Sequence, residues 1–295
     1  GDCFESSGSG GSKKIFVFET KDFVKWERRY IDVATEIGGG CAWAPEAIYN
    51  PLKDNYLIYW SCRVETDGFS RNRLYCNETR DFKSFGPTKL YEQEPFYKDW
   101  GKQIPRNDGY GNIDTSQLWV GEGDEPYKKL YRLVKDETDN HIQLMEASTV
   151  IDSTVDYDSS QPNQIIPYEL NGKIYSTLED LQGLTDFERA EVVWNWFREN
   201  SVGNHFRKVS QKHMEHYSGH YEGPCMFKFI DREEWCIMID YYKDNSIRYE
   251  PYLSGNLSKP ESVRKAKTGT YGRTNGDVGC HGGMIPVTTA NVTVG

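Results

Sequence analysis

No segment of this 295-residue sequence contains the run of roughly 20 apolar residues that a membrane-spanning helix needs. A basic surplus is also missing, because 35 Lys and Arg residues stand against 45 Asp and Glu residues, for a formal net charge of −10. Binding to nucleic acid depends on positive charge that neutralises phosphates. The sequence therefore predicts neither a membrane span nor a nucleic-acid partner.

The chain has no Cys-x-x-Cys pair, so a zinc site of that kind is not expected. It begins at Gly1 without a Met or an apolar signal segment, as a processed or truncated product would. Its seven cysteines are an odd number, and their spacing leaves the disulfide connectivity open. Three Asn-x-Ser/Thr sequons begin at Asn77, Asn256 and Asn291. Sequons and cysteines together favour an extracellular glycoprotein, with glycan on at least one of these asparagines.

Short runs of β-branched and aromatic residues, separated by turn residues, follow one another along most of the chain. They include residues 14–19, 55–60, 73–76, 129–133, 142–145, 226–230 and 235–240. Many short strands at this spacing predict a sandwich, a barrel or a propeller. Aromatic residues, 14% of the chain, fill such cores and also stack on sugars, so composition alone does not separate the two uses.

A weak internal repeat favours the propeller. Residues 19–26 resemble residues 77–85, and residues 253–257 are a fainter third copy. Each copy follows a predicted strand and places Thr or Ser, then Asp or Asn, then an apolar residue. A repeat of roughly 60 residues is typical of propeller blades, each of which is a four-stranded sheet.

Residues 152–217 break the strand pattern and are interpreted as an insertion between blades. Thr185 and Glu188 fit a capping box, and the aromatic residues that follow recur at helical spacing. The pattern predicts a helix near residues 186–200. We expect Trp194 and Phe197 to dock this helix against the propeller.

Four short motifs place a polar residue at the start of an otherwise apolar strand. They are "WAPEA" at 43–47, "NIDTS" at 112–116, "YEGP" at 221–224 and "HGGMIPV" at 281–287. The first strand of each propeller blade lines the central channel. The four motifs are therefore expected to bring Glu46, Asp114, Glu222 and His281 together.

At these motifs the sequence resembles glycoside hydrolase family 43, in particular its arabinofuranosidase- and xylosidase-like members. The similar segments are "IFVFETKDFVKW", "WAPEAIYNPLKDNYLIYWS", "NIDTSQLW" with "YKKLYRLVKDE", "YEGPCMFKF" with "WCIMIDYY", and "HGGMIPVT". The resemblance implies an all-β fold with one domain over residues 1–295. That domain is a five-bladed β-propeller whose first blade is incomplete in this chain.

The resemblance also implies catalytic roles. Glu222 corresponds to the general acid, and Asp114 to the carboxylate that orients this acid and tunes its pKa. The family's general base lies in an Arg-Asp-Pro type motif, which this sequence does not contain. We therefore expect the base outside this chain, on an upstream segment or a second chain that completes the propeller. From the residues alone, Asp114 could also be a turn carboxylate and Glu222 a strand-edge ion-pair partner.

Six further residues are candidates for substrate binding: Trp43, Glu46, Trp60, Lys135, Arg248 and His281. Packing inside a blade is the alternative for the two tryptophans, and a solvated turn is the alternative for Lys135. In the family, Arg precedes the histidine that corresponds to His281, whereas this chain has Cys280 there. No metal ligand set is predicted. The resemblance implies that His281 helps to hold a water or a structural calcium ion on the propeller axis, and a buried, hydrogen-bonded histidine without a metal is the alternative.

Two functions follow as hypotheses. One is an inverting glycosidase that acts on arabinose- or xylose-containing glycans and needs no cofactor. The other is a catalytically inactive propeller that binds glycans or serves as a structural part of a larger assembly. The retained Glu222, Asp114 and Glu46 favour the enzyme, whereas the missing base and Cys280 favour the inactive protein.

Overall fold

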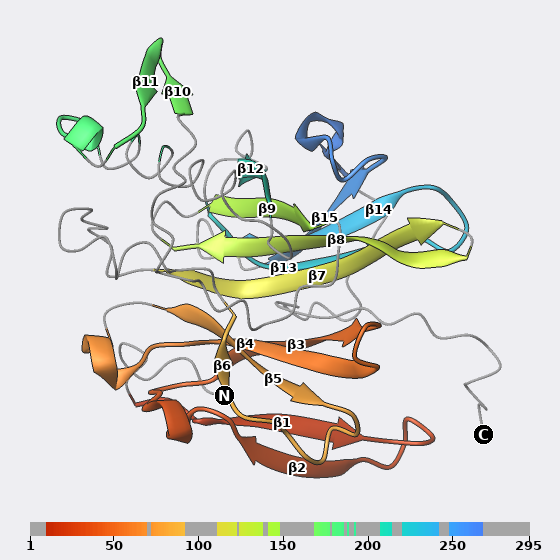
Figure 1. The fold of residues 1–295 in the computed structure, drawn as a ribbon. Helices are drawn as coiled ribbons and strands as arrows, with labels where there is room; N and C mark the ends of the chain where they lie inside the picture. Colours follow the sequence, from red (N-terminus) through yellow and green to blue (C-terminus); the bar gives the residue numbers. More distant parts are fainter. Residues whose placement is uncertain are drawn as a thin grey trace.

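A computed structural model describes residues 10–69, 72–91, 111–122, 124–137, 141–147, 168–177, 179–185, 188, 192, 207–213, 220–241 and 248–267. Antiparallel sheets make up this part of the chain (Figure 1). None of its helical segments is long and apolar enough to cross a membrane. The all-β prediction is confirmed for these residues.

Three of the sheets have four strands each, and two have two strands. The first two-stranded sheet contains β1 (Lys14–Glu19) and β2 (Glu27–Asp32). The four-stranded sheets contain β3 (Trp43–Asn50), β4 (Asn55–Cys62), β5 (Arg73–Thr79) and β6 (Lys89–Leu90); β7 (Asn112–Glu122), β8 (Glu125–Asp136), β9 (His141–Ala147) and β12 (Arg207–His213); and β13 (Tyr221–Lys228), β14 (Trp235–Tyr241), β15 (Arg248–Ser254) and β16 (Arg264–Lys265). The short strands β10 (Tyr168–Leu170) and β11 (Lys173–Tyr175) pair with each other. Short 3-10 turns are η2 (Thr35–Ile37), η3 (Glu65–Asp67), η5 (Glu179–Leu181) and η8 (Pro260–Ser262).

Each four-stranded sheet is an antiparallel meander in which the first strand of the chain lies at one edge. These first strands, β3, β7 and β13, also meet one another, since β7 contacts both of the others. Blades of a propeller have this arrangement, in which the first strand of each lies innermost. The described strands are therefore propeller-like, while the number of five blades stays a prediction.

The sheet of β7, β8, β9 and β12 corrects the expected end of the insertion predicted between blades. Strand β12 pairs with β9 and supplies the fourth strand of this sheet. The segment predicted as an insertion, residues 152–217, therefore overlaps the sheet at β12 and interrupts it between its third and fourth strands. A sequence pattern that is polar and irregular on both sides of β12 gave no signal for this strand.

The internal repeat is a structural repeat. Thr20 Oγ1 accepts a hydrogen bond from the backbone N–H of Phe23, and Asp22 Oδ1 accepts from Val24 at 2.9 Å. Thr79 and Asp81 accept the corresponding bonds in the second copy, where Phe82 has a positive φ as Phe23 does. In the third copy the hydroxyl of Ser254 accepts from the N–H of Asn256, and Asn256 Oδ1 accepts from Ser258. Short polar side chains thus cap the same turn three times.

This turn also indicates which strands of a sheet β1 and β2 represent. In two of the four-stranded sheets the turn follows the third strand in chain order, which is β5 in one sheet and β15 in the other, and precedes the fourth strand. The first copy follows β1 and precedes β2 in the same way. The two strands therefore correspond to the outer pair of a sheet whose first two strands are not among the described residues. That the first blade is incomplete in this chain stays a prediction.

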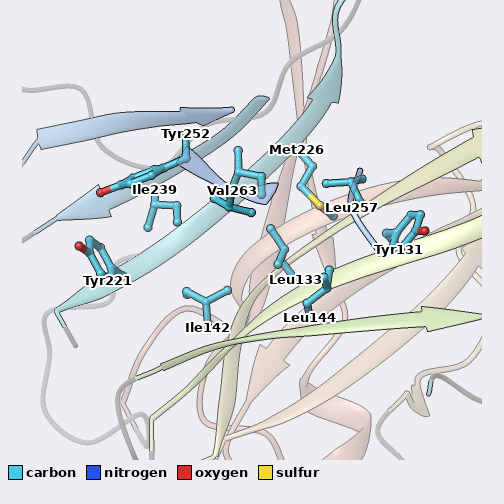
Figure 2. Packing of buried hydrophobic residues seen from close by; sticks show 11 residues of the cluster. Tyr131, Leu133, Ile142, Leu144, Tyr221, Met226, Ile239, Tyr252, Leu257 and Val263 are labelled. Atoms are coloured by element: carbon cyan, nitrogen blue, oxygen red, sulfur yellow. The ribbon is translucent and has the colours of Figure 1, made fainter. Parts of the chain in front are cut away.

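Apolar side chains fill the space between successive sheets. Ile15 of β1 packs with Trp60 and Val64, so the two-stranded sheet is fixed to the sheet of β3–β6. Between the other two four-stranded sheets, Leu133 and Leu144 face Met226 (Figure 2). These interfaces hold the first strands close to one another, which positions the central polar residues described below.

The predicted capping box is present at residue 185. The Thr185 N–H donates to Glu188 Oε2 at 3.0 Å, and the Glu188 N–H donates to Thr185 Oγ1 at 3.3 Å. Glu188 and Val192 have helical backbone conformation. The rest of the helix predicted near 186–200, with Trp194 and Phe197, lies outside the described residues.

Trp60 was predicted to bind substrate and Asn77 to carry a glycan. Both predictions failed, because the two side chains are buried against each other. Trp60 has 0% exposure, and its Nε1 donates to Asn77 Oδ1 at 2.9 Å. Asn77 Nδ2 donates to the Gly86 carbonyl and to Thr88 Oγ1, at 3.0 and 2.8 Å. A ring without an exposed face cannot stack on sugar, so Trp60 packs within its sheet. Asn77 does not present its amide nitrogen for glycosylation, since that nitrogen is buried and already donates twice.

Substitution of Asn77 tests this structural assignment. Asn77→Ala removes three hydrogen bonds and leaves the buried indole N–H of Trp60 unpaired, so the free energy of unfolding should fall by roughly 2–4 kcal/mol. Urea denaturation measures the change. Asn256→Ala is the control, because Asn256 is exposed and accepts one local bond, and it should cost less than about 1 kcal/mol. Equal losses for the two variants, or glycan on Asn77, would contradict the assignment.

Candidate active site

The first strands of all three four-stranded sheets carry the same irregularity. In each, two residues oppose one on the neighbouring strand, which defines a β-bulge. Ala44 and Pro45 oppose Trp60, as shown by the pairing of Trp43 with Ser61 and of Glu46 with Tyr59. The bulges of β7 and β13 contain Asp114 with Thr115, and Gly223 with Pro224. Three of the four sequence motifs thus coincide with three equivalent bulges.

The first residue of each bulge has a left-handed backbone. The φ values are 44° at Ala44, 49° at Asp114 and 55° at Gly223. Glycine adopts this conformation at little cost, whereas a residue with a Cβ atom loses about 1–2 kcal/mol. Bulges re-aim side chains and are common beside active sites. The strain at Asp114 is consistent with a functional position.

One hydrogen bond joins the bulges of β7 and β13. The N–H of Gly223 donates to Asp114 Oδ2 at 3.1 Å, and Asp114 is 8% exposed. Glu222 directly precedes Gly223 and is partly buried. The structure therefore brings the Asp114 carboxylate to the backbone beside Glu222.

A second polar chain connects β7 with β3. The N–H of Met226 donates to Ser116 Oγ at 3.3 Å, and Ser116 is hydrogen-bonded to the Glu46 carboxyl. Tyr59 Oη donates to Glu46 Oε2 at 3.0 Å. Burial of this carboxyl, with the charge of Asp114 nearby, raises the pKa of Glu46 to about 7, although the two hydrogen bonds oppose the shift. Glu46 therefore changes protonation near neutral pH.

Glu137 is a further carboxyl at this end of the sheets. It follows β8, its N–H donates to the Gly111 carbonyl at 2.8 Å, and its Oε2 accepts from Asn72 Nδ2 at 2.6 Å. Burial raises the pKa of Glu137, against the effects of the Asn72 hydrogen bond and the Arg63 charge, while the Asp114 charge adds to the rise. Gly111 is required here, because a Cβ atom at this position would lie 2.0 Å from the Asn72 carbonyl oxygen.

Lys135 and Trp43, both predicted to bind substrate, lie in unlike environments: Lys135 is buried between strands, and Trp43 is partly buried beside a bulge. Lys135 is 2% exposed, and its Nζ donates to the carbonyl of Tyr221 at 2.7 Å. It therefore ties β8 to β13, and it presents no ammonium group to a ligand in this structure. Trp43 is partly buried at the edge of a bulge, beside the core that contains Trp60. Its buried Nε1 has no hydrogen-bond partner among the residues that the structure describes.

The remaining predicted residues are less well defined. Arg248 begins β15 opposite Tyr241, but its side chain is outside the described part, as are His281 and Asn291. Asn256 is exposed in its turn, so a glycan there stays a prediction. Among the described residues no group of three or more His, Cys, Asp or Glu side chains could hold a metal ion.

Sequence reasoning missed three polar residues at the centre: Tyr59, Ser116 and Glu137. Ser116 lies in the "NIDTS" motif, in which only Asp114 was selected. Glu137 closes the family-like "KDE" segment, in which only Lys135 was selected. Tyr59 gives no such signal, because an aromatic residue in an apolar strand is indistinguishable from core.

Comparison with known proteins gives a family match along nearly the whole chain. A model for a domain related to glycosyl hydrolase family 43, described as "Probable glycosyl hydrolase domain", matches residues 2–293. An α-L-arabinofuranosidase of Bifidobacterium longum is 27% identical over 116 residues, which are 38% of this chain and 11% of that protein. The chain thus spans about a tenth of the length of this curated relative.

Two solved structures are examples of the similarity in fold. An exo-β-1,3-galactanase of Phanerochaete chrysosporium with galactose matches 89% of this chain and 45% of its own, with 10% identity and a TM-score of 0.47. An endo-arabinase of Bacteroides thetaiotaomicron matches 88% of this chain and 74% of its own, with 12% identity and a TM-score of 0.45.

The raised pKa of Glu46 predicts how the free energy of unfolding depends on pH. Between the ordinary glutamate pKa of 4.5 and the raised pKa of about 7, the folded state holds a proton that the unfolded state has released, so stability falls as pH rises through this window. The loss is about 2–3 kcal/mol, and Glu46→Gln should abolish it because glutamine does not titrate. Urea denaturation at pH 5 and pH 7.5 should therefore show wild type losing stability relative to this variant. A difference that is independent of pH would contradict the assignment.

Proposed function

This chain belongs to the glycosyl hydrolase domain family related to family 43, and we propose that it carries the general-acid side of an inverting glycosidase. The proposed substrates are arabinose- or xylose-containing glycans. One observation carries the proposal: the hydrogen bond from the Gly223 N–H to Asp114, which places a buried carboxylate beside Glu222. Family membership supports the reaction class, and the sugar is inferred from the resemblance of the motifs.

In this proposal Glu222 protonates the glycosidic oxygen of the leaving group. A general acid must hold its proton at working pH, and a neighbouring carboxylate favours the protonated form. Asp114 is the carboxylate in that position and modulates the pKa of Glu222. Its own orientation is fixed from two sides, by the left-handed backbone at Asp114 and by the Gly223 N–H.

The general base is assigned outside this chain. In an inverting reaction the base activates water on the opposite face of the sugar, with the two carboxyl groups roughly 6.5–9.5 Å apart. An Asp on an upstream segment or a second chain is proposed for this role, and the same segment would complete the first blade. The correspondence of β1 and β2 to an outer strand pair supports the need for such a segment.

Substrate binding is assigned to Glu46 and Trp43 of β3, together with Arg248 and His281. Below a pH of about 7 the Glu46 carboxyl is protonated, so it could donate a hydrogen bond to a sugar hydroxyl as well as accept one. No cofactor is assigned, apart from a water or calcium ion at His281. The extracellular location is likewise a proposal, and Asn256 is the exposed described asparagine available for glycan.

A glycan-binding or structural protein without activity is the second candidate. The observation in its favour is that central polar groups already make internal bonds between sheets. Asp114 accepts from Gly223, and Lys135 donates to Tyr221. Such bonds stabilise the packing of the sheets whether or not a reaction takes place.

Substitution of the proposed acid distinguishes the two functions. In a preparation of this chain together with its upstream segment, Glu222→Gln should lower the hydrolysis rate on natural arabinose- or xylose-containing glycans by roughly 10²–10⁴-fold. Aryl glycosides should lose less, because their leaving groups need less protonation. Rates are measured by sugar release, and the anomer formed first, detected by NMR, reports inversion.

The control is Glu261→Gln at an exposed position in η8, which should keep the wild-type rate. Equal rates for Glu222→Gln and wild type would reject the enzymatic role of Glu222. Glycan binding by a wild-type protein that releases no sugar would establish the second candidate instead.

A further inference from the structure

Two cysteines lie together at the end of the β3–β4 hairpin that is farthest from its turn. Cys62 is the last residue of β4, and Cys41 lies two residues before the start of β3. Both are 0% exposed and belong to one apolar core, together with Trp60. In the structure both are thiols.

Strand pairing brings their backbones opposite each other. Trp43 pairs with Ser61, and the antiparallel alignment continues beyond it, because the Gly40 N–H donates to the Arg63 carbonyl at 2.9 Å and Gly39 bridges Val64. Cys41 therefore lies across from the Cys62–Arg63 segment. Opposite residues of an antiparallel pair have Cβ atoms about 4.5–5.5 Å apart, close to the roughly 3.5–4.5 Å of a disulfide.

The two side chains also share one buried environment. Each thiol donates to a backbone carbonyl at the end of β4, Cys41 to Ser61 at 4.0 Å and Cys62 to Arg63 at 3.1 Å, so both sulfurs lie along the same short stretch of chain. The interaction between the two neighbouring thiols raises the pKa of Cys41 and lowers that of Cys62. Gly39 leaves little space around the Cys62 sulfur, since a Cβ atom at Gly39 would lie only 2.7 Å from it. The sulfur of Cys62 thus packs closely against the Gly39 backbone, two residues before Cys41.

We propose that Cys41 and Cys62 form a disulfide bond that joins the beginning of β3 to the end of β4. The bond would lie just before Trp43 and the bulge at Ala44, and so it would fix the direction in which β3 enters the centre of the fold. Glu46 is on the same strand, beyond this bulge. The inference does not depend on the proposed glycosidase activity.

The reaction needs an oxidant, and we assign a small-molecule disulfide such as glutathione disulfide. The Cys62 thiolate attacks one glutathione sulfur, which forms a mixed disulfide and releases one glutathione as thiolate. Cys41, once deprotonated, then attacks the Cys62 sulfur and releases the second glutathione. Two protein S–H bonds are replaced by one S–S bond, and two electrons reduce the oxidant to two thiols. Because both sulfurs are buried, the exchange takes place before β3 and β4 close over them.

Peptide mapping tests the bond directly. The full chain is refolded with glutathione disulfide, its free thiols are alkylated under denaturing conditions, and it is digested with trypsin without reductant. Residues 30–53 and 54–63 form tryptic peptides that each contain a single cysteine, Cys41 and Cys62. The expected product is these two peptides joined, lighter than their sum by two hydrogens. Alkylation of both cysteines, or linkage of either one to Cys3 or any other cysteine, overturns the proposal.

Thermal unfolding provides a second measurement. Reduction with dithiothreitol should lower the Tm of the oxidised wild type by roughly 5–10 °C, because the bond restricts the unfolded chain. The double variant C41A/C62A should lack this decrease, whereas C76A, in which another buried cysteine of the same sheet is replaced, should keep it. An equal effect of reductant on wild type and C41A/C62A overturns the proposal, even if both alanine variants are less stable overall.

Discussion

The hydrogen bond from the Gly223 amide to the Asp114 carboxylate joins two residues that are 109 positions apart in the chain. Both partners are bulge residues with positive φ, so the bond depends on two backbone distortions as well as on the sheet packing. Removing the bulge of β7 would turn the Asp114 side chain away from the centre, and removing the bulge of β13 would turn the Gly223 amide away. The position of Glu222 follows from this bond, because its neighbour Gly223 is held in place.

Gathering carboxyl groups in this way is unfavourable by itself. Burial raises the pKa values of Glu46 and Glu137, and in both cases the Asp114 charge adds to the rise. Hydrogen bonds from Tyr59 to Glu46 and from Asn72 to Glu137 offset part of this cost. A core held only by apolar contacts would need no such cluster, so its presence favours a role for the centre beyond packing.

Much of the centre could be predicted from local sequence signals. The "WAPE", "NIDTS" and "YEGP" motifs fall on three equivalent bulges, and the Thr-x-Asp-Phe copies fall on equivalent turns, because both features are encoded within a few consecutive residues. Burial was harder to predict. Trp60, Asn77 and Lys135 were assigned to ligand or glycan, yet each bonds to a partner from another strand: Trp60 and Asn77 to each other, and Lys135 to Tyr221. Alternation along a strand shows that its two faces differ, but the residue that covers a given face comes from elsewhere in the chain.

The position of β1 and β2 bears on the base that this chain is expected to lack. Each bulge lies on the first strand of a sheet, while β1 and β2 correspond to a third and a fourth strand. A first strand added to their sheet would take the place equivalent to β3, β7 and β13, and its own bulge region would face the same centre. We therefore expect the base on that strand, because a carboxylate there would approach Asp114 and Glu222 from another sheet, as the opposite face of the sugar requires.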